Sequence, residues 1–280
     1  MIGGGPIVSA LKNHLKKGFS VFVEKKAAKT IRDDLSEVAD LGFNLVEAVE
    51  NPDIFLSEID FNLIDTLLKI YDNYDLEYNV AVQDHGYIQG QSDRVTRMNF
   101  LEDFLKDGLK NAFFPSNHEI PNTFSRFNSI YNELVKKGIE NFSITDTAII
   151  AALGAVYNNE KWPAVTVDIG NGHTFACLVD KDYKVLGFFE HHTKMLTPEK
   201  FKYFIDKLIE GSITNKEVYD DKGHGAKIFK PYSYKNLPIL VTGPQRRSLV
   251  NEGGNIVFAS PLGDMMITGP VGIFMQQNLL

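Results

Sequence analysis

The chain has 280 residues, a net charge of −7 and 44% apolar residues, which is the composition of one or two ordinary globular domains. An acidic chain lacks the basic excess that neutralises a phosphate backbone, so a nucleic-acid partner is not expected. Cys177 is the only cysteine, which excludes an intrachain disulfide and a cysteine-held iron–sulfur cluster and favours a reducing cytoplasm. The longest strongly apolar run, residues 148–157, is too short to span a bilayer, so no membrane partner is expected.

The first half of the chain alternates helical and strand patterns. Helices are predicted over residues 6–17, 27–41 and 57–71, and strands over residues 20–24, 44–49 and 78–82. Such alternation is typical of a parallel sheet with helices on its faces. We therefore expect residues 1–162 to form a first lobe on a parallel sheet of these three strands, with one edge uncovered. Because an uncovered edge can pair with another chain, a homodimer or a partner chain is expected to complete this lobe.

A mainly helical segment follows over residues 99–157. Its last helix, residues 147–157, is rich in alanine and is expected to pack closely between two lobes, with Thr145 or Asp146 as its N-cap. Trp162-Pro163 is the predicted lobe boundary, since proline ends the helix and a strand pattern starts at once.

The second half, residues 163–280, carries the clearest pattern. Strands are predicted over residues 164–168, 174–179, 184–189, 237–241 and 255–258, and helices over residues 198–210, 245–251 and 268–278. The order β-β-β-α-β-α-β-α is that of the RNase H-like fold. We therefore expect a complete second lobe with strand order 3-2-1-4-5, in which strands one to three are antiparallel and strands four and five run parallel to strand one.

A glycine-rich turn joins the first two of these strands. Its sequence is Asp168-Ile169-Gly170-Asn171-Gly172-His173-Thr174. The two glycines let backbone N–H groups approach an anion, Asp168 can hold a magnesium ion through water, and Thr174 can add a hydroxyl donor. The turn therefore predicts a phosphate or nucleotide site, and the simpler alternative is a hairpin without a ligand.

Histidines are the second feature of chemical interest. His85 follows Asp84, and His173 occupies the glycine-rich turn. His191 and His192 lie just past the third predicted strand of the second half, and His224 lies between two glycines. Together with Asp84 and Asp264 they could line a cleft and bind a divalent metal or transfer protons, because neutral imidazole is a good ligand. We expect Asp168, His173 and His192 as metal ligands, and Asp168, Asp84 and His85 as catalytic residues. The alternative is a set of loop histidines that never meet.

Strand alternation limits this expectation, because adjacent residues on a strand point to opposite faces. At most one of His191 and His192 should therefore face the site. Two arginines, Arg94 and Arg97, follow the His85 segment and could clamp an anionic substrate or pair with local carboxylates.

The second half resembles the superfamily that joins actin, the sugar kinases and the heat-shock chaperone ATPases. In that superfamily the equivalent hairpin touches the nucleotide phosphates, and the loop after the fourth strand lies near adenosine. The resemblance implies that Gly243 and Pro244, in the loop of residues 241–247, contribute to nucleotide binding. Pro244 stands where the superfamily usually has a small residue.

A closer resemblance covers nearly the whole chain. It is carried by GGGP (3–6), VAVQDHG (80–86), DTAIIAALGA (146–155), VDIGNGHT (167–174), EHHT (190–193), GHGA (223–226), VTGPQRR (241–247) and GDMMITGPVG (263–272). These segments resemble an archaeal family of uncharacterised actin-like proteins, whose members often carry the label of pyruvate formate-lyase activating enzymes. The resemblance implies an actin-like ATPase fold of two lobes. It also implies Mg-ATP or a related nucleotide as the ligand.

The same resemblance implies a departure at the start of the chain. Members of the family open with an Asp-Gly phosphate hairpin ahead of the GGGP segment, whereas GGGP begins here at residue 3. We therefore expect the first lobe to lack that hairpin and its strands, through a truncated reading frame or because a separate polypeptide supplies them.

Three functions are consistent with these patterns. The first is a nucleotide-binding ATPase or phosphotransferase that uses magnesium. The second is a non-catalytic assembly or regulatory subunit of the same fold, and the third is a metal-dependent enzyme built on the histidines. Radical chemistry is not expected, because it needs three cysteines on one cluster and the chain has one.

Overall fold

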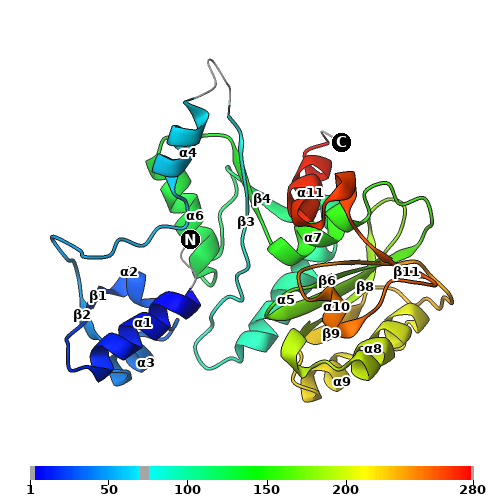
Figure 1. Ribbon diagram of the computed structural model, residues 1–280, viewed down its shortest axis with the longest axis horizontal. Coiled ribbons are helices and arrows are strands. Elements are labelled where there is room, and N and C mark those ends of the chain that lie inside the picture. The colour runs from blue at the N-terminus through cyan, green and yellow to red at the C-terminus, as the bar shows by residue number, and fades with distance from the viewer. Residues whose placement is uncertain (1–3, 70–75, 279–280) are drawn as a thin grey trace. The chain divides into compact units, whose positions relative to one another are not determined.

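The computed structural model describes residues 4–69 and 76–278. The chain divides into two compact units (Figure 1): unit 1 comprises Met1–Tyr78 and Ile120–Asn141, and unit 2 comprises Asn79–Glu119 and Phe142–Leu280. The lobe boundary expected at Trp162-Pro163 falls inside unit 2. Among the helices within the described ranges, none is long and apolar enough to cross a membrane.

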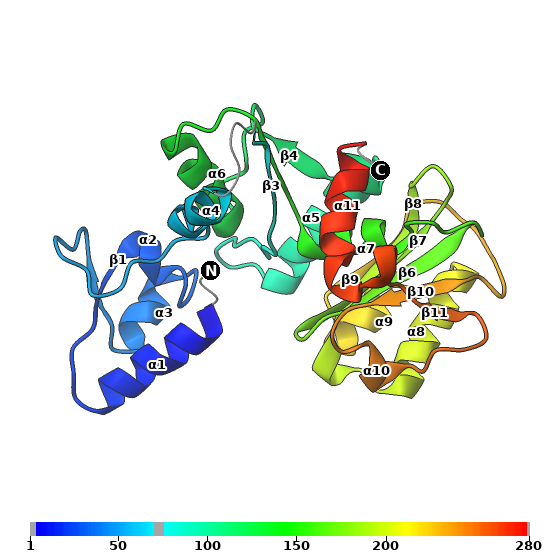
Figure 2. The ribbon, with the colours of Figure 1, turned by 45° about the horizontal axis from the view of Figure 1, so that its top comes forward.

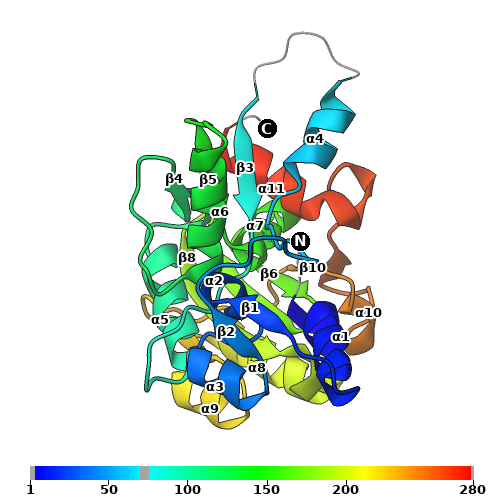
Figure 3. The ribbon, with the colours of Figure 1, turned by 90° about the vertical axis from the view of Figure 1, so that its left-hand side faces the viewer.

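Unit 1 is mostly helical with one small sheet. Its elements are α1 (Gly4–Lys16), β1 (Phe22–Glu24), α2 (Lys25–Ala28), α3 (Leu35–Asp40), β2 (Asn44–Val46), α4 (Phe61–Leu68) and α6 (Ser125–Lys136). Strands β1 and β2 pair in parallel with Phe22 opposite Asn44, and Figure 3 shows them side by side. A small apolar core of Ala28, Ile31, Val38 and Phe43 holds these elements together.

Two sequence-based expectations for unit 1 are wrong. The single helix over residues 27–41 is two helices, because the side chain of Asp34 accepts a hydrogen bond from Ser36 N and starts α3 afresh. The expectation of one three-stranded parallel sheet is also wrong. The strand expected over residues 78–82 belongs to a different sheet from β1 and β2. The helix expected over residues 57–71 begins later, at the Asp60 cap, and residues 70–71 lie outside the described residues.

Unit 2 contains a three-stranded sheet of order β3-β5-β4. Its strands are β3 (Tyr78–Ala81), β4 (Phe113–Pro115) and β5 (Phe142–Thr145), with helix α5 (Asp93–Leu105) and the short η1 (Leu109–Asn111) between the first two. Strands β4 and β5 are antiparallel. They interrupt the segment that was expected to be mainly helical, because short buried strands carry no period that separates them from helix ends.

The larger sheet of unit 2 has six strands in the order β11-β10-β6-β7-β8-β9. They are β6 (Ala164–Ile169), β7 (His173–Val179), β8 (Val185–His192), β9 (Gly225–Ile228), β10 (Ile239–Thr242) and β11 (Ile256–Phe258). Strands β6, β7 and β8 are antiparallel neighbours, while β10 and β11 run parallel to β6. The predicted order 3-2-1-4-5 is therefore confirmed, and β9 is an added sixth strand.

One face of the six-stranded sheet is an apolar core. Val165, Val167 and Ile169 of β6 pack there against Phe204 and Leu208. Those two residues belong to α8 (Pro198–Glu210), which begins as predicted, with the Thr197 side chain accepting from Lys200 N. Helices α9 (Asn215–Asp220) and α10 (Arg246–Leu249) follow α8 in the chain, and Figure 2 shows α8 and α10 on the side of the sheet away from α7 and α11.

The other face is covered by α7 (Thr147–Ala155) and α11 (Thr268–Gln276). The two helices cross closely at glycines: a Cβ on Gly154 would lie 1.9 Å from Thr268 O, and one on Gly272 would lie 2.1 Å from Ile150 O. The alanine-rich helix expected between lobes therefore packs inside unit 2. Its N-cap is Asp146, whose carboxylate accepts from Ala148 N.

Candidate functional site

Polar side chains gather at the edge of the six-stranded sheet where β6 and β8 end and β7 begins. In register, His173 lies opposite His192, and Asp168 and Glu190 both lie opposite Phe175. Paired residues share a face of the sheet, so these side chains point toward the face covered by α7 and α11. A row of charged and imidazole groups therefore replaces the apolar core at this edge.

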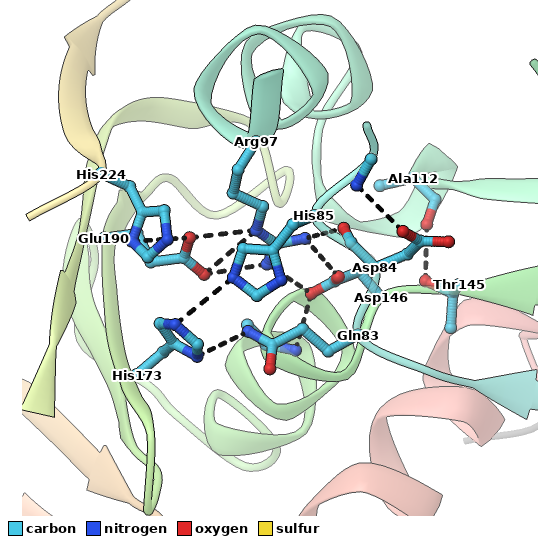
Figure 4. A network of polar contacts seen from close by, with 12 residues as sticks. Gln83, Asp84, His85, Arg97, Ala112, Thr145, Asp146, His173, Glu190 and His224 are labelled. Atoms are coloured by element: carbon cyan, nitrogen blue, oxygen red, sulfur yellow. Dashed lines mark hydrogen bonds and ion pairs between the residues drawn. The ribbon is translucent and has the colours of Figure 1, made fainter. Parts of the chain in front are cut away.

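A buried ion network anchors the site (Figure 4). Arg97 of α5 is 0% exposed, with Nη1 2.6 Å from Asp146 Oδ2, Nη2 2.8 Å from Glu190 Oε1, and Nη1 also donating to Asp84 O. Burial alone would raise the pKa of Glu190, but the Arg97 guanidinium outweighs burial and holds that pKa well below its usual range. Burial would likewise lower the pKa of Arg97, and Asp146 and Glu190 reverse that effect and raise it.

Neither arginine is left for the expected anion clamp. Arg97 donates hydrogen bonds to the carboxylates of Asp146 and Glu190 and to a backbone carbonyl oxygen. Arg94 donates to the backbone oxygens of Tyr219 and Gly223 and stacks 3.8 Å over the Tyr219 ring. The geometry therefore assigns both guanidinium groups to holding unit 2 together.

Three histidines meet beside this network. His85 Nε2 lies 3.3 Å from His173 Nε2, and His173 Nδ1 lies 3.1 Å from Gln83 Nε2. The ring of His224 is centred 4.9 Å from that of His173 and 5.3 Å from that of His85. One nitrogen from each of His85, His173 and His224 falls within 4.8 Å of the other two. The lobe boundary expected at Trp162-Pro163 would place His85 and His173 in different lobes, whereas both belong to unit 2.

The neighbouring pair His191 and His192 divides as strand alternation requires. His192 faces the site, with its ring centred 4.7 Å from that of His224. His191 points to the other face, where its Nε2 lies 3.2 Å from Asp221 Oδ2 and its ring packs on Phe204. The prediction that at most one of the two faces the site is confirmed.

Burial keeps the clustered imidazoles neutral. It lowers the pKa of His85 to about 4, with a further contribution from Arg97, and it lowers the pKa of His224 to about 3 against the opposing pull of Glu190. Burial also lowers the pKa of His173 and of His192. Neutral imidazole is the form that binds metal ions, so the cluster is in its ligand form near neutral pH.

Asp168 lies at the end of β6, and its pKa is raised rather than lowered. Burial, reinforced by the carboxylates of Asp146 and Glu190, raises its pKa to about 7. Within residues 4–69 and 76–278, no group hydrogen-bonds to its carboxylate. Asp168 lies outside the group of three histidines, which instead contains His224, a residue absent from the expected metal ligands.

The glycine-rich turn lies against the loop after β10. Gly243 has φ +95°, and a Cβ there would lie 2.4 Å from Ile169 O and 2.5 Å from Asp168 Oδ1, so only glycine fits. Gln245 donates to Ile169 O through its backbone and to Asn171 Oδ1 through its side chain. The two loops therefore meet at the carboxyl ends of parallel strands β6 and β10. Gly172 and Pro244 are exposed at this place.

Thr174 does not supply the expected phosphate donor. It alternates with His173 onto the α8 side of the sheet, where its buried Oγ1 lies 3.0 Å from Thr193 Oγ1. Thr193 Oγ1 in turn donates to Gly170 O, so the two threonines hold the glycine-rich turn from the α8 side of the sheet.

Two of the expected acidic residues have structural contacts. The carboxylate of Asp84 accepts from Gly86 N at 2.9 Å, and that of Asp264 accepts from Met266 N at 2.8 Å and caps η4 (Met265–Ile267). Sequence reasoning missed Glu190, for which the available signal was a carboxylate directly before two histidines at the end of a strand.

Cys177 is buried in the middle of β7. Its Sγ lies 3.3 Å from Thr166 Oγ1, and burial raises the pKa of the thiol to about 12. A thiol in this state is a core side chain, and one cysteine cannot hold an iron–sulfur cluster.

No curated protein matches this chain, and no solved structure matches it. A family model described as "Putative pyruvate format-lyase activating enzyme (DUF1786)" matches residues 2–248. The family label expected from the sequence is thereby confirmed, and the chain belongs to the family that this model describes.

Proposed function

We propose that this protein is an actin-like ATPase or phosphotransferase that binds the phosphates of a magnesium nucleotide at the carboxyl edge of its six-stranded sheet. The observation that carries the proposal is the close approach of Gly243 to Asp168 and Ile169, which brings two loops together at the ends of parallel neighbours β6 and β10. In open α/β sheets, ligands bind outside the carboxyl ends of such strands.

The strand order supports this proposal. Strands β8, β7, β6, β10 and β11 follow the order 3-2-1-4-5 with the alternation of antiparallel and parallel pairs that an RNase H-like lobe has. In the actin-like superfamily that the sequence resembles, the hairpin equivalent to Gly170–His173 holds phosphate. Fold alone does not fix function, so the proposal depends on the site.

Asp168 is the residue that would hold the magnesium ion. Its carboxylate has no hydrogen-bond donor among the residues described, and Asp146 and Glu190 disfavour its charge. A bound Mg²⁺ would reverse that disadvantage, since a hard cation binds carboxylate oxygen and bridges to phosphate through its water shell. The exposed backbone at Asn171 and Gly172 would then face the phosphate groups.

The activity named in the family description does not fit these residues. An activating enzyme of that kind holds its cluster on three cysteines, and the 280 residues include one, which is buried. The carboxylate and glycine residues at the sheet edge favour phosphate chemistry instead.

Calorimetric titration with Mg-ATP tests the proposal on the wild-type chain and on Asp168→Ala. We expect saturable, magnesium-dependent binding that Asp168→Ala abolishes without lowering the melting temperature, because this carboxylate contributes little to packing and burial disfavours its charge. Asp182→Ala is the matched control, since Asp182 lies in the β7–β8 turn at the other end of the same strands. That variant should bind Mg-ATP like the wild type.

Phosphate release, measured under the same conditions, separates an enzyme from a regulatory subunit. Binding with release that depends on Asp168 supports the ATPase or phosphotransferase. Binding without release in the presence of candidate acceptors supports the non-catalytic subunit. If Mg-ATP and other magnesium nucleotides fail to bind, or Asp168→Ala binds them like the wild type, the proposal is wrong.

A further inference from the structure

The geometry points to a transition-metal site in which His85, His173 and His224 bind one divalent first-row ion such as Zn²⁺. This site adjoins the proposed magnesium nucleotide site at His173 of the glycine-rich turn but differs from it in ligand chemistry, and it does not depend on that proposal. Three imidazoles from three segments of the chain converge on one point.

The shortest distance in the cluster matches metal coordination. His85 Nε2 and His173 Nε2 are 3.3 Å apart. In a tetrahedral site with Zn–N bonds of about 2.0–2.1 Å, neighbouring ligand nitrogens are separated by about 3.3 Å. A direct hydrogen bond between the two rings would need one protonated and one bare nitrogen, whereas a metal ion uses both lone pairs.

One ring already has an acceptor at the nitrogen opposite the cluster. His224 Nδ1 lies 3.5 Å from Glu190 Oε2. Metal-binding histidines are generally oriented by such an acceptor, which takes the N–H of the ring nitrogen that does not bind the ion. His173 Nδ1 lies 3.1 Å from the side-chain amide of Gln83, whose oxygen would be the acceptor when His173 Nε2 binds the ion. Since Nδ1 of His224 faces Glu190, its Nε2 is the nitrogen left for the ion. Arg97 fixes Glu190 in turn with two bonds (Figure 4).

The charges around the cluster also favour a cation. The carboxylates of Asp146 and Glu190 share the single guanidinium of Arg97, Asp168 lies near enough to both carboxylates for them to raise its pKa, and the clustered histidines are neutral. Buried carboxylates that outnumber their cations are costly, and a divalent ion beside them offsets that cost. The neutral imidazoles select a borderline ion such as Zn²⁺ over Mg²⁺, which prefers oxygen ligands.

Three protein ligands are the number found in catalytic zinc sites, which keep a fourth position for water or substrate. Among the residues described, the group within coordinating reach contains His85, His173 and His224 and no further histidine, cysteine, aspartate or glutamate. His192 borders it, with its ring centred 5.0 Å from that of His173. The ligand class we infer is therefore a divalent transition-metal ion with one exchangeable coordination position.

Metal content tests the inference with the metal alone and no nucleotide. The full chain is loaded with Zn²⁺, dialysed, and its zinc measured by mass spectrometry, and Co²⁺ replaces Zn²⁺ for a visible spectrum. We expect one ion per chain and the intense absorption of four-coordinate Co²⁺. His173→Ala and His224→Ala should lose the ion, while His118→Ala, at an exposed position of unit 2, should keep it.

A second measurement covers the case in which a buried alanine variant fails to fold. Chemical modification of histidines by diethyl pyrocarbonate is followed in the wild-type chain by peptide mass spectrometry, with and without Zn²⁺. Zinc should protect His85, His173 and His224 and leave His118 reactive. Wild-type chain that retains no zinc and no cobalt, or zinc that protects His118 as well as the cluster, would overturn the inference.

Discussion

The two faces of the six-stranded sheet in unit 2 are built from alternate residues of the same strands and have opposite properties. On one face Ile169, Ala176 and Phe189 pack in an apolar core with α8. On the other, Asp168, His173 and Glu190 join the buried ions and histidines. A single strand thus contributes to stability with one residue and to chemistry with the next. Burial alone therefore does not distinguish a core position from a site position.

The largest loss of stability is expected from a substitution on the polar face. Replacing Arg97 by Met leaves Asp146 and Glu190 buried without their cation. Removing one partner of a buried ion pair costs about 3–5 kcal/mol, so urea unfolding should show a loss of that order. Arg94→Met is the control, because Arg94 is only half-buried and binds backbone oxygens. Equal losses in the two variants would show that the buried network does not dominate this face.

A substitution on the apolar face should lower the stability of the protein and leave ligand binding unchanged. Leu208→Ala removes a fully buried side chain of α8 and should cost about 2–5 kcal/mol in the same unfolding experiment. Zinc content and Mg-ATP affinity should stay at their wild-type values at a temperature where the variant is folded. Leu208→Met, which conserves volume, should cost less than about 1.5 kcal/mol. A loss of zinc in folded Leu208→Ala would mean that the two faces are not independent.

The stability of the polar face should depend on pH through Asp168. Its folded-state pKa of about 7 lies above the ordinary 3.8, so the folded chain retains a proton that the unfolded chain releases. Stability from this group is present at low pH and lost as the pH rises toward the folded pKa. The stability of Asp168→Asn relative to wild type should therefore grow between about pH 4 and pH 7, by up to about 1.4 kcal/mol per pH unit.

This difference is measured by urea unfolding of both proteins at several pH values, without added metal. Asp182→Asn, at the exposed β7–β8 turn, serves as the control and should follow the wild type. Parallel curves for wild type and Asp168→Asn would contradict the raised pKa.

The smallest change in stability is expected from a substitution at His192. Its side chain is half-buried and no hydrogen bond holds it among the residues described, so His192→Ala should change stability by less than about 0.5 kcal/mol. His191→Ala, on the apolar face, removes a buried ring beside Asp221 and Phe204 and should cost more. Thermal unfolding of both variants is the measurement. The reverse order would show that His192, and not His191, has the structural role.

Much of unit 2 could be predicted from the sequence because its signals are local. Strand alternation separated His191 from His192, α8 spans the predicted residues 198–210, and Asp146 was one of two named caps of α7. These features depend on a few neighbouring residues whose backbone preferences and hydrogen bonds agree. Unit 1 was predicted less well, since Asp34 and Asp60 started helices within segments that had a continuous helical period.

By itself the sequence determined the order and direction of five strands in the larger sheet, the glycine turn at the end of β6, and the absence of a cysteine-held cluster in these residues. Only the tertiary structure decided which polar residues meet. His85 and His224 are 139 positions apart in the printed sequence, yet their ring centres lie 5.3 Å apart. Arg97, Asp146 and Glu190 come together in the same way. The physical reason is that local patterns fix which face a side chain takes, whereas contacts between distant segments depend on how whole sheets and helices pack.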